Sequence, residues 1–188
     1  MKRQKWQQKL KAIEALIKAP LGYRLELINS SHTPFIIKWR NDSSINRFFF
    51  SQEKLTIKKQ ENFLKNYFSK DRIDFILTYQ KEDLPIGSFS IKNVHTFPEL
   101  GQLIGEKRFR GKGLAKKVTL ALIDIAYDYL GLDSLWARIQ KRNRINIHLH
   151  QKLGFLTVGE ESFDNIDYLI MRLKKEDWLR FSSESKLK

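Results

Sequence analysis

Apolar side chains recur at helical spacing in five segments of this chain. Residues three and four positions apart share one face of a helix, so this spacing predicts amphipathic helices. The predicted helices span residues 2–19, 35–39, 56–69, 113–130 and 143–153. Apolar residues lie almost all round the 113–130 segment, which predicts a helix that is covered on more than one side.

Runs of β-forming residues, some alternating between apolar and polar, lie between these helices. The predicted strands span residues 23–28, 73–79, 86–94, 100–105, 134–140, 155–158 and 166–173. Residues 41–44 are predicted to end the 35–39 helix, and residues 81–85 to form a polar turn between strands. The last two strands are predicted to pair antiparallel, and the long helix to cross over between strands. The sequence therefore predicts an α+β fold with a mixed sheet.

Residues 1–20 are predicted to form a basic helical extension, and residues 21–188 a single domain. The extension places Trp6, Leu10 and Ile13 on one face and lysines on the other. Such a helix usually docks on its own domain, although it can also bind a membrane surface or a partner. The sequence leaves its role open.

Composition excludes several classes of protein. A chain of 188 residues with 41% hydrophobic residues is typical of a globular domain. No window approaches the roughly 18 apolar residues of a membrane span, and residues 1–20 lack the apolar stretch of a signal peptide. The absence of cysteine excludes disulfides, thiolate metal sites and a cysteine nucleophile. These features predict a cytoplasmic protein that does not bind membranes.

The net charge of +14 has two interpretations. It can attract an anionic partner, or it can reflect solvated lysines spread along the whole chain. No RNP1 motif or zinc finger is present, so a nucleic-acid partner is not expected from motifs. RNA binding through the basic helix of residues 2–19 is kept as an alternative.

A Gly-rich segment, Arg108–Ala115, lies between a predicted strand and the long predicted helix. The first turn of a helix has unpaired N–H groups and about half a positive charge from the helix dipole. Gly111 and Gly113 lack a Cβ, so an anion can approach the backbone closely. This order of elements predicts a cradle for a phosphate group.

Two further motifs make this cradle more specific. Asn143–Phe155 is similar to the pattern Asn-x-x-Ser-x-x-Leu-Tyr-Glu-Lys-Leu-Gly-Phe, and Trp39–Asp42 follows a short predicted helix. Together with the cradle, whose spacing is Arg-x-x-Gly-x-Gly, they resemble the GNAT acetyltransferases over roughly residues 22–175. The likeness is to the branch that includes ribosomal-protein and amino-sugar-nucleotide acetyltransferases. It implies a mostly antiparallel sheet with a splayed central strand pair and flanking helices.

The resemblance implies acetyl-CoA as the cofactor. Backbone groups of Ile104, Gly105 and Glu106 would bind its pantetheine chain, and the thioester carbonyl would be polarised by an N–H group there. The pyrophosphate would lie on the main chain of Arg110, Gly111, Lys112, Gly113, Leu114 and Ala115.

At about 100° per residue, Asn143, Asn146 and His150 share one face of the 143–153 helix. Asn143 and Asn146 are thereby implied as cofactor contacts. Ile145, Leu149 and Leu153 are predicted to form the opposite, buried stripe. His148 and His150 diverge by about 200° on the helix, so they are not a zinc pair and no metal site is predicted.

The proton-transfer residues depart from the family pattern. His150 stands where the family has the Tyr that protonates the departing thiolate, and a histidine can also act as a general acid. It can equally be a polar residue that only faces the cofactor. Glu99 is the candidate base, with a surface charge at a strand end as the alternative. Because the chain has no cysteine, direct attack by an amine in a ternary complex is expected.

The acceptor amine is less certain than the cofactor. Trp39, Arg40 and Arg47 resemble the acceptor side of enzymes that acetylate UDP-amino-sugars, although Trp39 and Arg40 can also be structural. A protein N-terminus is the main alternative acceptor, and a polyamine is disfavoured by the positive charge. A CoA-binding module with little turnover is a further alternative. A homodimer is possible, because exposed final strands often pair.

Overall fold

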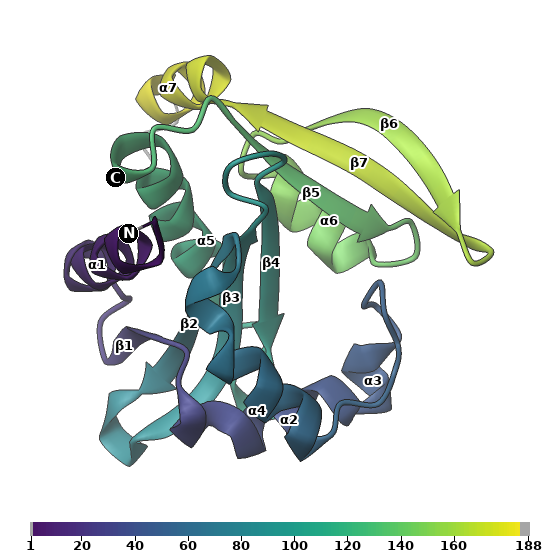
Figure 1. Cartoon of the computed structure of the whole chain (residues 1–188). Coiled ribbons are helices and arrows are strands. Elements are labelled where there is room, and N and C mark those ends of the chain that lie inside the picture. Colours follow the sequence, from purple (N-terminus) through teal and green to yellow (C-terminus); the bar gives the residue numbers. More distant parts are fainter. Residues whose placement is uncertain (1, 185–188) are drawn as a thin grey trace.

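The computed structural model describes residues 2–184. Seven strands form a single sheet in the order β1-β2-β3-β4-β5-β7-β6 (Figure 1). The strands are β1 (Tyr23–Leu27), β2 (Arg72–Tyr79), β3 (Leu84–Lys92), β4 (Glu99–Ile104), β5 (Ser134–Gln140), β6 (Leu156–Phe163) and β7 (Ile166–Lys174). All neighbours pair antiparallel except β4 and β5, which are parallel. The predicted α+β fold with a mostly antiparallel sheet is confirmed.

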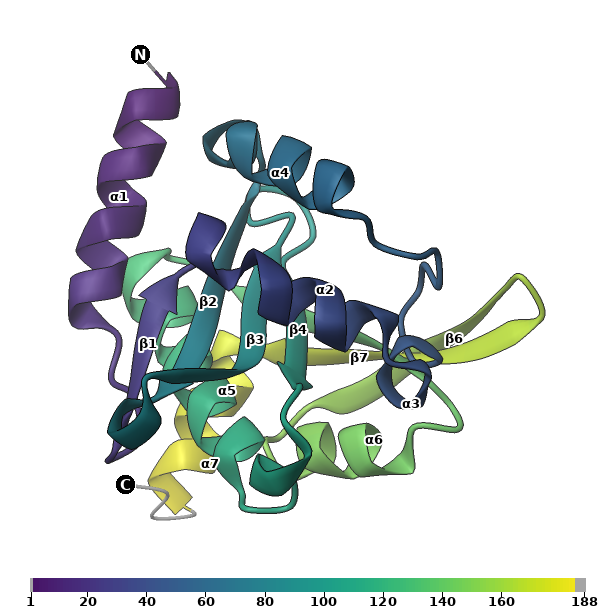
Figure 2. The same cartoon turned by 90° about the horizontal axis from the view of Figure 1, so that it is seen from below.

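Seven α-helices flank the sheet in the described part of the chain. They are α1 (Lys2–Leu16), α2 (Thr33–Asn41), α3 (Ser43–Asn46), α4 (Ile57–Lys65), α5 (Leu114–Asp124), α6 (Arg144–Gln151) and α7 (Lys175–Glu184). A π-helical turn, Ile125–Tyr129, continues α5, so the predicted 113–130 helix is present but changes its winding near the end. Figure 2 shows α1 beside β1 and α2 across the middle of the sheet.

The basic extension docks on the domain. Leu10 and Ile13 of α1 are almost fully buried in the same core as Leu25, Phe75 and Phe89 of the sheet. Two fully buried aliphatic side chains stabilise such a contact by about 3 to 6 kcal/mol. The lysine-rich face of α1 points outward.

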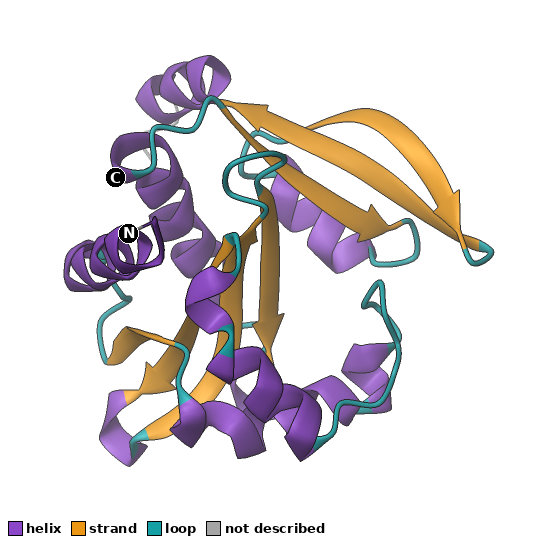
Figure 3. Ribbon diagram, in the orientation of Figure 1, coloured by secondary structure: helices purple, strands orange, loops and turns teal. Residues whose placement is uncertain are grey.

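Beyond one bridge, the parallel strands β4 and β5 separate. Their only paired residues are Glu99 and Trp136, where the Trp136 N–H donates to the Pro98 carbonyl at 2.8 Å. From that point the two strands diverge (Figure 3). Because β4 pairs with β3 along its whole length, the edge that it turns towards β5 is open at its C-terminal end.

Candidate active site

The cradle between β4 and α5 presents a row of free N–H donors. Gly111 and Gly113 have φ angles of +74° and +73°, and no atom lies within 4 Å of a Cβ built on either. None of the backbone N–H groups from residue 111 to residue 116 donates to a backbone carbonyl, and the first such donor is Lys117, which bonds Gly113. A diphosphate accepts hydrogen bonds in this geometry, so the cradle fits the pyrophosphate of a nucleotide cofactor.

Arg110 fixes the start of the cradle to the end of β4. Its Nε donates to the Ile104 carbonyl at 3.0 Å and its Nη2 to the Gly105 carbonyl at 2.7 Å. Asp42 lies 3.9 Å from the same guanidinium. The Arg110 side chain therefore positions the loop, while the free donors of the cradle belong to the main chain.

The three residues predicted to bind pantetheine are not equivalent. The N–H groups of Gly105 and Glu106 both donate to the Ile86 carbonyl, at 2.8 and 3.2 Å. Backbone groups alternate in direction along a strand, so the N–H of Ile104 points to the opposite edge, where β5 has separated. In this arrangement only Ile104 turns an N–H group towards the gap.

Trp39 and Glu106 lie under the end of β4. The Trp39 ring is 1% exposed, packs against Gly105, and donates its Nε1–H to Glu106 Oε1 at 2.9 Å. Burial opposes ionisation of Glu106, but hydrogen bonds from Lys38 and Trp39 outweigh it and lower the pKa of the carboxyl. The indole thus supports β4 and has no ring face exposed to an acceptor.

Helix α6 turns both apolar and polar side chains towards the protein interior. Asn143 caps the helix by accepting the Asn146 N–H on Oδ1 at 3.4 Å. Of the predicted buried stripe, Leu153 is fully buried and Leu149 packs against the core, but the prediction is wrong for Ile145, which is 87% exposed. The residues buried in α6 are instead Ile147 and His150. The helix packs on the side from which Asn146 and His150 reach into the molecule.

His150 is a neutral, almost completely buried imidazole. It is 1% exposed, its ring lies edge-on to Phe155, and Nδ1 is 2.9 Å from the Asn146 carbonyl. Burial lowers the pKa of His150 to about 4. A carbonyl only accepts, so Nδ1 carries the proton and Nε2 has a lone pair, which is buried without a partner. The acid role predicted for His150 needs a proton on Nε2, which this state lacks.

The low pKa of His150 makes folding stability depend on pH. The folded pKa of about 4 lies below the ordinary value of 6.5, so between these values the unfolded chain binds more protons. We expect the free energy of unfolding to fall by about 2 kcal/mol between pH 7.5 and pH 5 from this residue alone.

Urea melts at the two pH values measure this loss, and His150→Phe is the variant that removes it. His32 contributes in the same direction, because burial lowers its pKa too, so its share remains in the variant. An unchanged pH dependence in His150→Phe would show that His150 already titrates normally in the folded state. The turnover of this variant, measured against its acetyl-CoA affinity, tests the acid role.

Gln102 is a site residue that the sequence pattern does not reveal. From the middle of β4 its amide contacts Asn146 of α6 and the hydroxyl of Thr119 on α5, each at 2.5 Å. A lone Gln in a strand carries no periodicity or motif signal, so only the three-dimensional arrangement identifies it.

Glu99 lies at the closed end of the β4–β5 pair. Its carboxylate is 3.5 Å from Lys92 Nζ and is largely shielded from solvent. At about 3.3 Å per residue, its Cα is about 16 Å along the strand from Ile104. A base at this position would reach an amine beside Ile104 only through water.

The segment after α2 gathers arginines around three phenylalanines. The guanidinium groups lie over the rings: Arg40 4.2 Å from Phe49, Arg47 4.7 Å and Arg142 6.0 Å from Phe48, and Arg138 5.2 Å from Phe50. Among these four, only Arg138 has a carboxylate partner in the described residues, Glu161 at 2.9 Å. We call Arg40, Arg47 and Arg142 the unpaired arginines.

Carbonyl groups hold two of the three unpaired arginines in place. Arg40 donates to the Ser51 carbonyl at 3.3 Å, and Arg142 donates to the Arg47 carbonyl at 2.7 Å. Burial lowers the pKa of Arg40, and the charge of Arg72 adds to this effect. Sequence reasoning identified Arg40 and Arg47 but missed Arg138 and Arg142, which reach this segment from β5 and the turn after it.

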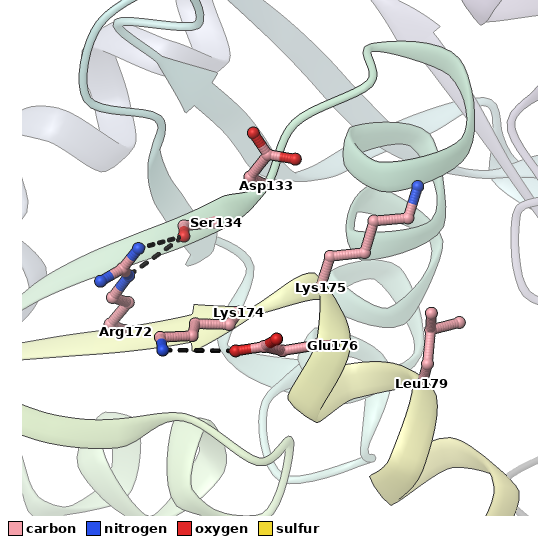
Figure 4. Close-up of a pocket in the computed structure, with 7 residues that line it drawn as sticks. All are labelled: Asp133, Ser134, Arg172, Lys174, Lys175, Glu176 and Leu179. Atoms are coloured by element: carbon pink, nitrogen blue, oxygen red, sulfur yellow. Dashed lines mark hydrogen bonds and ion pairs between the residues drawn. The ribbon is translucent and has the colours of Figure 1, made fainter.

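A separate hollow of about 460 Å³ lies where β7 meets α7 (Figure 4). Its lining is charged but internally paired: Lys174 lies 3.3 Å from Glu176, and Arg172 donates to Ser134 Oγ at 2.7 and 3.0 Å. None of the predicted site residues lines it. Within residues 2–184 no three His, Cys, Asp or Glu side chains gather as metal ligands, and no helix is long and apolar enough to cross a membrane.

Known proteins resemble this chain in sequence and in fold. The sequence profile of the acetyltransferase (GNAT) domain matches residues 23–156, which include β4, the cradle and α6. The chain belongs to the GNAT acetyltransferase family. It is therefore an acyltransferase that uses acetyl-CoA and acetylates amines.

The acetyltransferases to which this chain is similar carry different enzyme names. Spermidine N(1)-acetyltransferase of Escherichia coli is 27% identical over 133 residues, which cover 68% of this chain and 71% of that protein. Acetyltransferase PseH of Campylobacter jejuni is 26% identical over 150 residues, covering 80% and 90%. The structure of Vibrio cholerae spermidine N-acetyltransferase with CoA and spermine superposes with a TM-score of 0.77 at 19% identity, covering 85% of this chain and 99% of that one. The GNAT fold is thus common to all of them.

Proposed function

We propose that this GNAT enzyme acetylates the amine of a UDP-amino-sugar, by direct attack on acetyl-CoA in a ternary complex. The unpaired arginines carry this proposal. They form a cationic surface beside the open end of β4 and β5, with three guanidinium groups that lack a carboxylate in the described residues. Guanidinium groups bind phosphate oxygens in bidentate geometry. A polyamine would instead be repelled here.

An aromatic hollow continues this surface. A cavity of about 530 Å³ is lined by Phe50, Ser51, Gln52, Phe163, Asp164, Ile166 and Tyr168. The rings of Phe50 and Phe163 stack at 4.5 Å, and the Tyr168 hydroxyl is buried without a hydrogen-bond partner. Aromatic walls together with the polar side chains of Ser51 and Gln52 suit a sugar or a uracil ring. An acceptor with a diphosphate and a planar ring therefore fits both parts of this surface.

The reaction transfers the acetyl group without an acetyl-cysteine intermediate, because the chain has no cysteine. The amine nitrogen attacks the thioester carbonyl carbon, the C–S bond breaks, one amine proton leaves, and the CoA thiolate takes up a proton. The N–H of Ile104 would polarise the carbonyl oxygen, and most of the rate would come from positioning. Glu99 as base and His150 as acid remain predictions.

A thiol-release assay with an acceptor panel tests the proposal. The panel contains a UDP-amino-sugar, a peptide with a free N-terminus, and spermidine, each with acetyl-CoA. We expect the UDP-amino-sugar to give the highest kcat/KM. Faster turnover of spermidine or of the peptide would overturn the acceptor assignment, and CoA binding without release from any acceptor would indicate a non-catalytic CoA-binding module.

Neutralising Arg47 should weaken the acceptor alone. Arg47→Gln removes an exposed, unpaired guanidinium, so we expect the KM of the UDP-amino-sugar to rise about tenfold, with the KM of acetyl-CoA unchanged. Arg144→Gln is the matched control, since Arg144 is also exposed but lies on α6 outside the unpaired arginines. Equal effects of both substitutions would reduce the role of Arg47 to the general positive field.

A further inference from the structure

A chain of polar side chains crosses the gap where the backbones of β4 and β5 have separated. The Thr119 hydroxyl on α5 lies 2.5 Å from Gln102 Oε1 and 2.8 Å from the Ala115 carbonyl, so these two acceptors share its one proton, with the shorter bond to Gln102. Gln102 Nε2 donates to Asn146 Oδ1 at 2.5 Å. Thr119 is almost completely buried, whereas Gln102 and Asn146 are only half-buried. The chain thus runs from the interior of α5 to the open side of the gap.

The hydrogen bonds that link Thr119, Gln102 and Asn146 determine which way the Asn146 amide points. An amide has one accepting atom and one donating atom, so an Asn146 that accepts from Gln102 must turn its NH2 group elsewhere. Asn146 Nδ2 has no acceptor in the described residues and remains accessible to solvent. The cap bond from the Asn146 N–H to Asn143 fixes the backbone of the same residue. The only polar atom left free on the Asn146 side chain is a donor.

We propose that Gln102 and Thr119 are positioning residues, which hold the Asn146 amide with its NH2 group towards the pantetheine chain of acetyl-CoA. The inference rests on the proposed function for the placement of Asn146 at the cofactor. Pantetheine contains two amide carbonyls, and an NH2 group held in advance donates to such a carbonyl without the entropic cost of ordering it on binding. In this arrangement Gln102 acts on the cofactor only through Asn146.

An almost isosteric substitution at Gln102 is expected to reverse the orientation of the Asn146 amide. Gln102→Glu replaces the donating NH2 by an oxygen, which can accept from Thr119 but cannot donate to Asn146. The Asn146 amide then turns its NH2 inward, to the new carboxylate, and its oxygen outward. We expect the Kd of CoA, measured by calorimetry, to rise about tenfold, with the KM of acetyl-CoA rising more than kcat falls.

A double-mutant cycle separates the negative charge that Gln102→Glu introduces from the amide orientation. In an Asn146→Ala background the charge remains but there is no amide to turn, so Gln102→Glu should change the Kd of CoA less than about twofold. Thr119→Val should weaken CoA binding without any new charge, whereas Thr119→Ser, which keeps the hydroxyl, should restore it.

Two outcomes would overturn the proposal. An unchanged Kd in Gln102→Glu would mean that Asn146 already donates inward in the native protein. An equal loss in the native and Asn146→Ala backgrounds would mean that the charge alone acts. Both readouts use CoA without an acceptor, so failure of the acceptor assignment in the thiol-release assay leaves this test intact. Thermal melts of each variant show whether it is folded.

Discussion

Replacing Gly105 with alanine is expected to destabilise the protein by about 3 kcal/mol, at the upper end of what overpacking costs. A Cβ at this position would fall within the indole ring of Trp39, whose other side is packed in the domain. Trp39 cannot retreat without breaking its hydrogen bond to Glu106. A thermal melt should show a fall in Tm of about 10 °C for a chain of this length.

Two controls locate the cause of this loss. Gly159→Ala places a Cβ where no atom lies within 4 Å, so its Tm should stay within about 2 °C of the native value. In a Trp39→Val background, Gly105→Ala should cost less than about 1 kcal/mol, because the ring that it meets is gone. A native-like Tm for Gly105→Ala itself would contradict the tight packing between Trp39 and β4.

Gly113→Ala is expected to raise the Kd of acetyl-CoA by about a hundredfold or more, while destabilising the fold by only about 1 to 2 kcal/mol. Gly113 has a φ angle of +73°, which an L-residue adopts at a cost of about 1 to 2 kcal/mol. The new Cβ meets no protein atom but projects from the cradle, where it displaces the pyrophosphate from the free N–H groups. Calorimetry with acetyl-CoA measures the loss of affinity.

Gly131→Ala is the matched control for the cradle. Gly131 has a φ angle of +70°, and a Cβ there also meets nothing within 4 Å, but it lies at the far end of the helical segment that α5 begins. Its Tm should fall as much as that of Gly113→Ala, and its acetyl-CoA affinity should be native. Native affinity in Gly113→Ala would place the pyrophosphate elsewhere.

Sequence periodicity predicted the sheet well, because its central strands combine β-forming residues with clear turns. The predicted strand 134–140 coincides with β5, and the predicted 166–173 differs from β7 by one residue at its end. Pro85 was assigned to a turn but lies inside β3, where it pairs with Thr78 beside a bulge that leaves Ile86 of the same strand without a partner on β2. A bulge relaxes local pairing, so it tolerates a residue without an N–H group.

Short and peripheral helices were harder to predict. Residues 41–44 were expected to end a helix, and α2 does end at Asn41. The sequence did not reveal that Asp42 accepts the Ser44 N–H on its side chain and begins α3. A helix as short as α3 is too brief for a periodic signal. Ile145 was expected in a buried stripe because apolar spacing gives the face of a helix but not the direction from which the protein covers it.

Some parts of the candidate site could be predicted from the sequence, and others could not. The cradle was predictable because it is one contiguous segment, in which the glycines and the start of the helix are enough to indicate phosphate binding. Gln102 and Arg142 bond partners that lie 44 and 95 positions away in the sequence, and a local sequence pattern cannot reveal contacts between residues so far apart. Trp39 illustrates the converse, because a motif residue proved to be a buried support of β4.

The single bridge between β4 and β5 has a mechanical consequence. The sheet consists of two halves, one of β1 to β4 and one of β5 to β7, which share backbone pairing only at that bridge. Beyond it, side-chain hydrogen bonds connect the two sides: Gln102 with Asn146, Gln140 with the Phe49 carbonyl, and Arg142 with the Arg47 carbonyl. A cofactor bound along Ile104 would contact both β4 and β5, and would supply connections between them that the resting protein lacks. We therefore expect the joint between β4 and β5 to be stiffer with the cofactor bound than without it.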